Sequence, residues 1–448
     1  MCITSPPYWR LRDYSACPHC EGCVTETPLC ENCNGTGRLK GAEQIWGGDP
    51  NCDHAWVTCA IKGQSGGPSD KQLSNAGSRF DNSTCSTCSA WFGSLGLEST
   101  PELFIEHLVM IFREVRRVLR DDGTLWVNIG DSYANDSKWG GESGGKQAYL
   151  SGTDRKCAGR GKRFTGLKSK DLIGVPWMLA FALRADGWYL RSANIWQKPN
   201  VMPGSQQDRP TCDYEYVFLL SKSSKYFYDN EAVKQPALSK PKKAGRNSRA
   251  YKDRDRQHGT SKQDSIKRGD YIGFNERYDF HNPLLTRTLR TTWTIPTQPS
   301  AYKHFAMFPE RLAEIPILAG TSEHGCCAGC GTPHTRIFTK QIINLSNAAI
   351  AGTEIVGKGH PTSQIRENHD IRDGPVTITQ TTGWYKQCQC ETEETISCTV
   401  LDPFSGAATS GLVALKLGRQ YIGIEQNELY NRIAEERLIN ADLDVIIL

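Results

Sequence analysis

Long apolar stretches are missing from this sequence. Nowhere in its 448 residues is there a run of about 18 apolar residues, the length that a membrane-spanning helix needs. The N-terminus lacks the charged and apolar segments of a secretory signal, so we expect a cytoplasmic protein with no membrane partner. Neither sign of charge is in large excess, since the formal net charge is +4. Any attraction to a polyanion therefore depends on where the basic residues cluster.

Cysteine, by contrast, is abundant. The chain has 18 cysteines and no export signal, which favours metal-bound thiolates over disulfides. A length of 448 residues is enough for a large core with one or two inserted modules.

The first distinctive motif is Thr4-Ser5-Pro6-Pro7-Tyr8-Trp9, almost at the N-terminus. Adjacent prolines fix φ and remove two N–H donors, which predicts a rigid, non-helical turn whose carbonyls point outward. Carbonyls beside an aromatic face suit a planar ligand with an NH₂ group, such as a nucleobase flipped out of its duplex. A solvent-exposed polyproline docking motif or a plain loop is the alternative interpretation.

The C-terminal part of the chain contains a second pattern. A predicted strand at residues 399–402 leads into a glycine turn at 403–406, a helix continues to about residue 415, and apolar residues 421–424 precede Glu425. Strand, glycine turn, helix, strand and terminal acid is the order of a nucleoside-binding βαβ unit.

Together, Ser5-Pro6-Pro7-Tyr8 and Asp402-Pro403-Phe404-Ser405-Gly406 resemble the amino-methylating DNA methyltransferases, which modify N4 of cytosine or N6 of adenine. The order, catalytic turn first and cofactor loop last, is similar to their circularly permuted beta class, in a phage or prophage type with zinc inserts. The resemblance implies an α/β, Rossmann-like, doubly wound fold around a mixed seven-stranded sheet. It also implies S-adenosyl-L-methionine as the cofactor, double-stranded DNA as the substrate and, in a restriction system, a separate nuclease.

The resemblance places the chemistry in the N-terminal turn. An exocyclic amine is a poor nucleophile because its lone pair is delocalised into the ring. If the Pro6 carbonyl and the Ser5 hydroxyl each hold an amine hydrogen while the base stacks on Tyr8, the lone pair can face the sulfonium methyl. No covalent intermediate is required. The implied catalytic residues are Ser5, Pro6, Pro7 and Tyr8.

On the cofactor side, the resemblance brings residues 404–406 to the methionine moiety and Glu425 to the ribose hydroxyls. Residues 304–312 resemble the family's short motif near the methionine end, with the start of a core helix as the alternative. Asp131 follows a predicted strand, either beside the active site or as a cap for the next turn. The implied cofactor-binding residues are Asp131, Phe305, Phe308, Pro309, Asp402, Pro403, Phe404, Ser405, Gly406, Thr409 and Glu425.

Two features depart from the family pattern. Ala407 and Ala408 stand where a second glycine and a small polar residue are usual, which alanine tolerates provided that φ is not positive. Relatives carry a strand and an acidic turn before the catalytic turn, whereas only three residues precede Thr4 here. We therefore expect either a late start or a partly unguarded adenine edge of the cofactor.

Cysteines at knuckle spacing mark two insertions. Tetrahedral zinc needs four N or S ligands, and each C-x₂-C knuckle supplies two from a tight turn. Reduced, buried cysteines are the alternative, and Cys23, Cys59 and Cys326 leave the ligand pairing open. The first insertion, which lacks strong helical or strand periodicity, offers Cys17, Cys20, Cys30, Cys33, Cys52, His54, Cys85 and Cys88. The second offers Cys327, Cys330, Cys388 and Cys390.

Between the insertions, apolar spacing predicts the body of the enzyme. A helix with Thr100 as its N-cap should run to about residue 119, followed by a strand at 124–129, a helix at 171–185 and strands at 188–196 and 215–220. The expected division is a catalytic turn (1–14), a zinc-binding insertion (15–95), the catalytic half (96–232), a basic target-recognition segment (233–298), a cofactor-side motif (299–325), a second zinc-binding insertion (326–397) and a cofactor-binding unit (398–448).

A basic segment favours DNA as the partner. Twelve Lys or Arg stand against three Asp between residues 234 and 268, and no apolar periodicity is present. Phosphate contact is the functional interpretation, and a solvated, partly disordered stretch is the alternative. Residues 134–166 are likewise either a loop that closes over DNA or a linker. The candidate DNA-binding residues are Lys242, Lys243, Arg246, Arg249, Lys252 and Arg254.

Serine as the first residue of the turn favours N4 of cytosine, because Asp or Asn is commoner there in the adenine-N6 enzymes. An adenine-N6 enzyme is the first alternative. A catalytically lapsed, zinc-containing DNA-binding protein is the alternative from another class. Methylation of RNA or of a protein glutamine is disfavoured by the basic segment.

Overall fold

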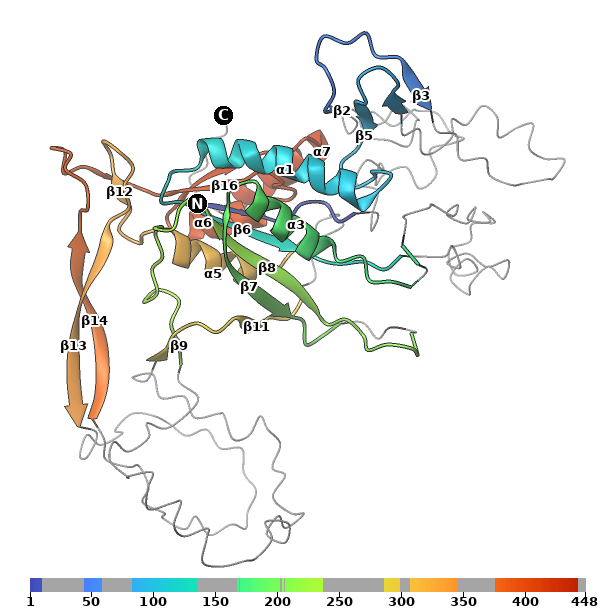
Figure 1. The fold of residues 1–448 in the computed structure, drawn as a ribbon. Coiled ribbons are helices and arrows are strands. Elements are labelled where there is room, and N and C mark those ends of the chain that lie inside the picture. Colours follow the sequence, from blue (N-terminus) through green and yellow to red (C-terminus); the bar gives the residue numbers. More distant parts are fainter. Residues whose placement is uncertain are drawn as a thin grey trace, which may run out of the picture.

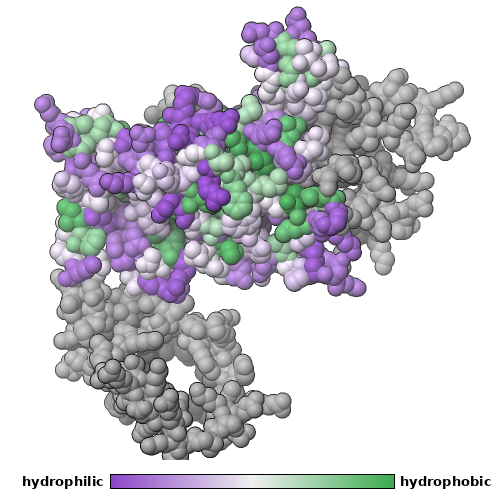
Figure 2. All heavy atoms as spheres, in the orientation of Figure 1, coloured by the Kyte–Doolittle hydropathy of each residue, from purple (hydrophilic) through white to green (hydrophobic). Residues whose placement is uncertain are grey.

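The computed structural model describes residues 1–9, 44–58, 83–134, 167–168, 170–201, 204, 206–236, 286–298, 307–344 and 375–441. All structural statements below concern these residues, none of whose helices is long and apolar enough to cross a bilayer. On the face drawn in Figure 2, their hydrophilic and apolar side chains are interspersed in small patches. The expectations for Cys17, Cys20, Cys30, Cys33, Phe305 and the basic residues between 242 and 254 lie outside them.

A mixed sheet of seven strands forms the centre of the molecule (Figure 1). Its order is β11 (Thr292–Thr294), β7 (Tyr189–Gln197), β8 (Tyr214–Ser221), β6 (Thr124–Ile129), β1 (Cys2–Thr4), β16 (Thr399–Asp402) and β17 (Gln420–Gly423). Only β8 runs antiparallel to its neighbours. The predicted mixed seven-stranded sheet is therefore confirmed, and each strand predicted at 124–129, 188–196 and 215–220 is present within one residue.

Helices cover both faces of this sheet, as a doubly wound fold requires. On one face, α1 (Pro101–Val118) and α3 (Val175–Ala185) pack with the odd-numbered residues of β6, such as Leu125 and Val127. On the other, α5 (Glu310–Gly320) and α6 (Thr409–Lys416) pack with Trp126. A last helix, α7 (Glu428–Ile439), contacts α6. Successive side chains of buried β6 therefore pack into two apolar cores, one on each face of the sheet.

The sequence predicts the start of α1 correctly but not the start of α3. Thr100 caps α1 as predicted, because its hydroxyl accepts the Leu103 N–H at 3.2 Å. The helix expected at 171–185 begins only at Val175, so that expectation was wrong by four residues. Gly174 has φ +82°, and the first N–H groups are held by the carboxylate of Asp131, from the end of β6. The helix start is therefore set by a tertiary contact.

The N-terminal strand lies between two strands from distant parts of the chain. In β1, Cys2 pairs with Leu125 of β6 and with Leu401 of β16. The Thr4 hydroxyl donates to the buried carboxylate of Asp402 at 2.6 Å. Because β1 and β16 are parallel, the segments that follow them leave the sheet at the same edge.

The described part of the first insertion is a small sheet beside α1 (Figure 1). Its strands, in the order β2 (Gln44–Trp46), β5 (Trp91–Gly93), β4 (Ser83–Cys85) and β3 (Trp56–Thr58), have three residues each. Strands this short show no detectable periodicity, which is why none was predicted. The rings of Trp46 and Trp91 both stack with His107 of α1, with centroids 5.0 and 5.2 Å away.

The second insertion contains a long hairpin that extends from the body (Figure 1). Strands β13 (Thr335–Asn344) and β14 (Pro375–Tyr385) pair antiparallel, with a bulge between Ile337 and Phe338. At its base, β12 (Cys326–Cys327) pairs with β15 (Thr395–Ile396). A further two-stranded sheet joins β9 (Gln235–Pro236) to β10 (Thr286–Arg287).

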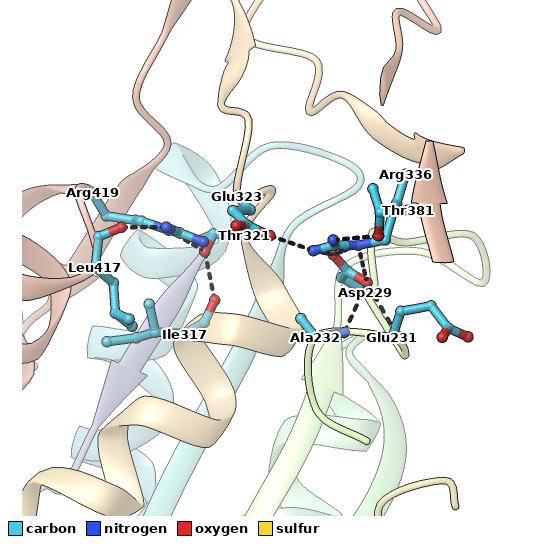
Figure 3. A network of polar contacts seen from close by, with 10 residues as sticks. All are labelled: Asp229, Glu231, Ala232, Ile317, Thr321, Glu323, Arg336, Thr381, Leu417 and Arg419. Atoms are coloured by element: carbon cyan, nitrogen blue, oxygen red, sulfur yellow. Dashed lines mark hydrogen bonds and ion pairs between the residues drawn. The ribbon is translucent and has the colours of Figure 1, made fainter. Parts of the chain in front are cut away.

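An arginine network joins the hairpin to the body (Figure 3). Arg336 of β13 donates two hydrogen bonds to Asp229 and one to Glu323, at 2.7–3.0 Å. Asp229 also accepts the backbone N–H groups of Glu231 and Ala232, and its side chain is only 4% exposed. A buried carboxylate destabilises the folded protein unless a cation is paired with it, because removing its charge from water is costly.

Replacing Arg336 by Ala should therefore lower the free energy of unfolding by about 3 kcal/mol, because Asp229 stays buried without its cation. Chemical denaturation measures this. Arg117→Ala is the control: its pair with Glu114 is exposed, so we expect a change below about 0.5 kcal/mol. Equal effects of the two substitutions would contradict this role of the network.

Thr4→Val should cost about 2 kcal/mol of unfolding free energy, because it removes a hydrogen bond to a buried carboxylate while keeping the branched shape. The control is Thr399→Val, which loses an exposed hydrogen bond to Gln420 on the same sheet, at a cost below about 0.5 kcal/mol. A Thr4→Val protein as stable as the control would show that the Asp402 contact is not a main link between the two ends.

Candidate active site

The Pro-Pro turn, residues 5–8, leaves the sheet at the carboxyl end of β1 in a non-helical conformation, as predicted. Two glycines make room for it. A side chain at Gly130 would meet the Tyr8 ring at 2.7 Å, and Gly96, at φ +91°, lies against Pro7 and the Tyr8 carbonyl. The sequence patterns did not single out either glycine, since their neighbours come from another part of the chain.

The turn is also held by the segment that joins the first insertion to α1. The indole N–H of Trp9 donates to the Glu98 carbonyl at 3.2 Å. The fully buried carboxylate of Glu98 accepts the Gly96 N–H at 2.8 Å and contacts Nδ1 of His107 at 3.0 Å. The small sheet, α1 and the Pro-Pro turn therefore form one packed unit.

Polar side chains of three strands meet behind the turn. The Ser5 hydroxyl donates to Asn128 of β6 at 3.3 Å, and the Tyr8 hydroxyl donates to Glu215 of β8. Lys198, just after β7, forms an ion pair with Glu215. Sequence analysis did not identify Asn128 or Glu215 as partners of the turn, although a buried asparagine in a mostly apolar strand such as β6 was an available signal.

The glycine loop, residues 402–408, follows β16 at the same edge. Asp402 accepts hydrogen bonds from Thr4, from the Ser410 hydroxyl at 2.5 Å and from the Phe404 N–H at 3.0 Å. Burial raises the pKa of Asp402, and these donors oppose the shift. Asp402 does not line the cavity between the loops, so it supports the loop from within.

Both Gly406 and Ala408 have positive φ, +52° and +53°. The condition that alanine avoids positive φ is therefore not met at Ala408, which begins α6 in a left-handed conformation. That conformation costs a residue with a Cβ about 1–2 kcal/mol, and packing of the Ala408 methyl with Leu412 offsets part of this cost.

Glu425 closes the loop from the end of β17. Its carboxylate accepts the Gly406 N–H and the Asn427 N–H, each at 2.9 Å. Burial raises the pKa of Glu425, while these N–H donors lower it. The acid predicted to end the βαβ unit is thus in contact with the glycine loop, at the position from which it can face a ligand in the cavity.

One cavity of about 1040 Å³ lies between the Pro-Pro turn and the glycine loop. Its lining includes residues 5–8 from the N-terminal end and residues 403–407, Thr409 and Glu425 from the C-terminal end. Folding thus brings the N-terminal turn and the C-terminal loop to one cavity. A cavity of this size accommodates a small molecule and part of a second ligand.

Other predicted cofactor-side residues divide between the cavity and the helices. Phe308 lines the cavity and also packs in the core, and Pro309 is the residue before α5, so the helix start is confirmed and the cofactor-side interpretation stays a prediction. Asp131 caps α3 and is not among the cavity residues.

The structure brings together two of the predicted ligand sets. In each of two groups, Cys52, His54, Cys85, Cys88 and Cys327, Cys330, Cys388, Cys390, the ligand atoms all lie within 4.8 Å of one another. The Sγ atoms of Cys52 and Cys85 are 3.8 Å apart, and Cys88 Sγ is 3.3 Å from His54 Nδ1. Four soft ligands at this spacing can hold a tetrahedral metal ion.

The chain resembles known proteins in sequence. A family profile described as DNA methylase matches residues 1–328 and 393–436. The chain is 34% identical over 352 residues to the Type II methyltransferase M.SmaI of Serratia marcescens, covering 78% of each protein. It is 35% identical over 352 residues to M.Cfr9I of Citrobacter freundii, covering 79% of this chain and 77% of that protein.

Among solved structures, the PvuII DNA methyltransferase, described as cytosine-N4-specific, matches over 76% of each chain with 13% identity and a TM-score of 0.35. The profile covers most of the chain, and the two named relatives share about a third of their residues with it over three quarters of their length. On this evidence, the protein belongs to the DNA methylase family.

Proposed function

We propose that this DNA methylase transfers the methyl group of S-adenosyl-L-methionine to the exocyclic amine of a base flipped out of double-stranded DNA, with N4 of cytosine favoured. The observation that carries the proposal is the shared cavity, which the Pro-Pro turn and the glycine loop line from opposite ends of the sequence. A methyl donor held by one loop would face an acceptor held by the other.

The turn's task is to prepare a weak nucleophile. We assign the Pro6 carbonyl and the Ser5 oxygen as acceptors for the two amine hydrogens, and the Tyr8 ring as the stacking surface for the base. Holding both hydrogens lets the nitrogen become pyramidal and localises its lone pair toward the donor. The Ser5 side chain, rather than the Asp or Asn commoner in adenine enzymes, is what favours cytosine.

The glycine loop fits the cofactor. S-adenosyl-L-methionine supplies a sulfonium-bound methyl group, which is electrophilic without further activation. We assign residues 404–406 to the methionine part and the Glu425 carboxylate to the two ribose hydroxyls, consistent with its position at the end of β17. Ionised Glu425 can accept both hydroxyls, whereas the protonated acid accepts fewer hydrogen bonds.

We further propose that both four-residue clusters bind structural zinc. Zinc–sulfur bonds of about 2.3 Å in a tetrahedron give sulfur–sulfur distances of about 3.8 Å, which the Cys52 and Cys85 atoms match. The small sheet around the first cluster has strands of only three residues and little apolar core of its own. A metal would supply the missing stability.

Phosphate binding is proposed for the basic segment, residues 233–298, on the strength of its composition. The two competing functions are methylation of adenine N6 and DNA binding by a catalytically lapsed protein. Analysis of the methylated nucleoside separates the adenine enzyme from the proposal, and uptake of labelled cofactor separates the lapsed protein.

The test of function is mass analysis of nucleosides from DNA incubated with the protein and S-adenosyl-L-methionine, which should reveal N4-methylcytosine. Tyr8→Ala should reduce methyl transfer about 10- to 100-fold, because a stacked base is worth about 1–3 kcal/mol, while cofactor affinity is kept. Glu425→Ala should instead weaken cofactor binding about tenfold or more, because two hydrogen bonds to a charged group are lost.

Exposed Tyr385 and Glu428 provide matched controls, since their alanine variants should keep both activity and cofactor affinity. N6-methyladenine as the product would select the adenine alternative. DNA binding without uptake of labelled cofactor would select the lapsed protein.

The zinc proposal predicts at least one ion for each of the two described clusters, measured by elemental mass spectrometry after dialysis. Cys327→Ser should lower the zinc content by one ion, because three remaining ligands hold zinc more weakly. Cys212→Ser, at an exposed cysteine outside both clusters, should leave it unchanged. Unchanged zinc content in the Cys327 variant would refute that site.

A further inference from the structure

The polar side chains behind the Pro-Pro turn, Asn128 and Glu215, determine which way the Ser5 hydroxyl points. Asn128, only 5% exposed, has its amide nitrogen 3.1 Å from Glu215 Oε2 and 3.2 Å from the Tyr216 carbonyl. Both neighbours are acceptors without hydrogens, so the NH₂ of Asn128 must lie on that side. Its oxygen therefore faces Ser5.

An amide oxygen can only accept, so the Ser5 hydroxyl must donate its single hydrogen to Asn128, 3.3 Å away. The lone pairs of the Ser5 oxygen then remain available for a ligand in the cavity. The opposite orientation would aim the Ser5 hydrogen at the target amine and engage the lone pair that has to receive the methyl group. The direction of this one hydrogen bond is thus a requirement of the proposed chemistry.

Glu215, together with the Tyr216 carbonyl, fixes this orientation of Asn128. Its Oε2 accepts from both Asn128 and the Tyr8 hydroxyl, and its Oε1 accepts from Lys198. The Lys198 ammonium lies 4.4 Å from the centre of the Trp196 ring, which helps to hold it in place. Side chains of Lys198 and Glu215 are 18% and 13% exposed, so the pair is largely shielded from solvent.

We propose that Glu215 is a positioning residue for methyl transfer: through Asn128 it orients the Ser5 hydroxyl as an acceptor toward the target amine, and directly it holds the Tyr8 ring. This inference rests on the proposed function of the Pro-Pro turn. Glutamine at position 215 has one acceptor oxygen and an NH₂ group, so it cannot accept from Asn128, Tyr8 and Lys198 together.

The experiment measures the single-turnover rate of methyl transfer with the full chain, saturating DNA and S-adenosyl-L-methionine. Glu215→Gln should lower the rate constant about 10- to 100-fold, as loss of a preorganised hydrogen bond does, with cofactor affinity and thermal midpoint near wild type. Lys198→Gln should give a smaller loss of about fivefold in the same rate constant, because Asn128 and Tyr8 keep their acceptor on Glu215. Glu231→Gln is the matched control, because its pair with Lys234 has similar exposure and its contacts are with Lys234 and Asp229 rather than with the Pro-Pro turn.

A double-mutant cycle separates positioning from a structural role. In a Ser5→Ala/Tyr8→Phe background the two hydroxyls are absent, so Glu215→Gln should then slow transfer less than about threefold. An undiminished effect in that background, or wild-type speed of Glu215→Gln alone, would overturn this inference. If Ser5→Ala/Tyr8→Phe itself kept wild-type speed, the proposed function of the turn would fall, and the inference with it.

Discussion

The buried carboxylate of Asp402 is the contact on which the arrangement of this protein depends. It receives hydrogen bonds from Thr4 of β1, from Ser410 of α6 and from the backbone of its own loop. A carboxylate away from water is tolerated only when such donors compensate for the lost hydration. Since these donors come from both ends of the chain, satisfying Asp402 also fixes the Pro-Pro turn beside the glycine loop.

The inserted modules are attached by contacts of a different kind. The small sheet joins the body through stacked rings on His107, and the hairpin joins it through Arg336 and Asp229. Each module is too small to bury a large apolar core. Ring stacking and the ion pair therefore contribute more to its attachment than apolar burial does. Glu98, which lies between the small sheet and α1, contacts both Trp9 and His107, so it connects the residue on which the sheet stacks with the Pro-Pro turn.

Elements with regular spacing of apolar residues, or with a cap residue next to them in the sequence, could be predicted. The Thr100 cap, the apolar face of α1 and the buried strand at 124–129 all appear as expected, because their signals are local. The start of α3 was not predictable, since Asp131 supplies its cap from another strand. Nor were the three-residue strands or the positive φ of Ala408, which no local pattern encodes.

The sequence by itself determined the chemical components: a rigid turn with a hydroxyl and an aromatic ring, a glycine loop ending in an acid, and cysteines at ligand spacing. Those properties depend on side-chain type and short-range spacing. Only the tertiary structure decided that Asp402 and Asp131 support loops and helices, and that Asn128 and Glu215 lie behind Ser5 and Tyr8. Such partners lie on strands far apart in sequence, and the order of the sheet brings them together.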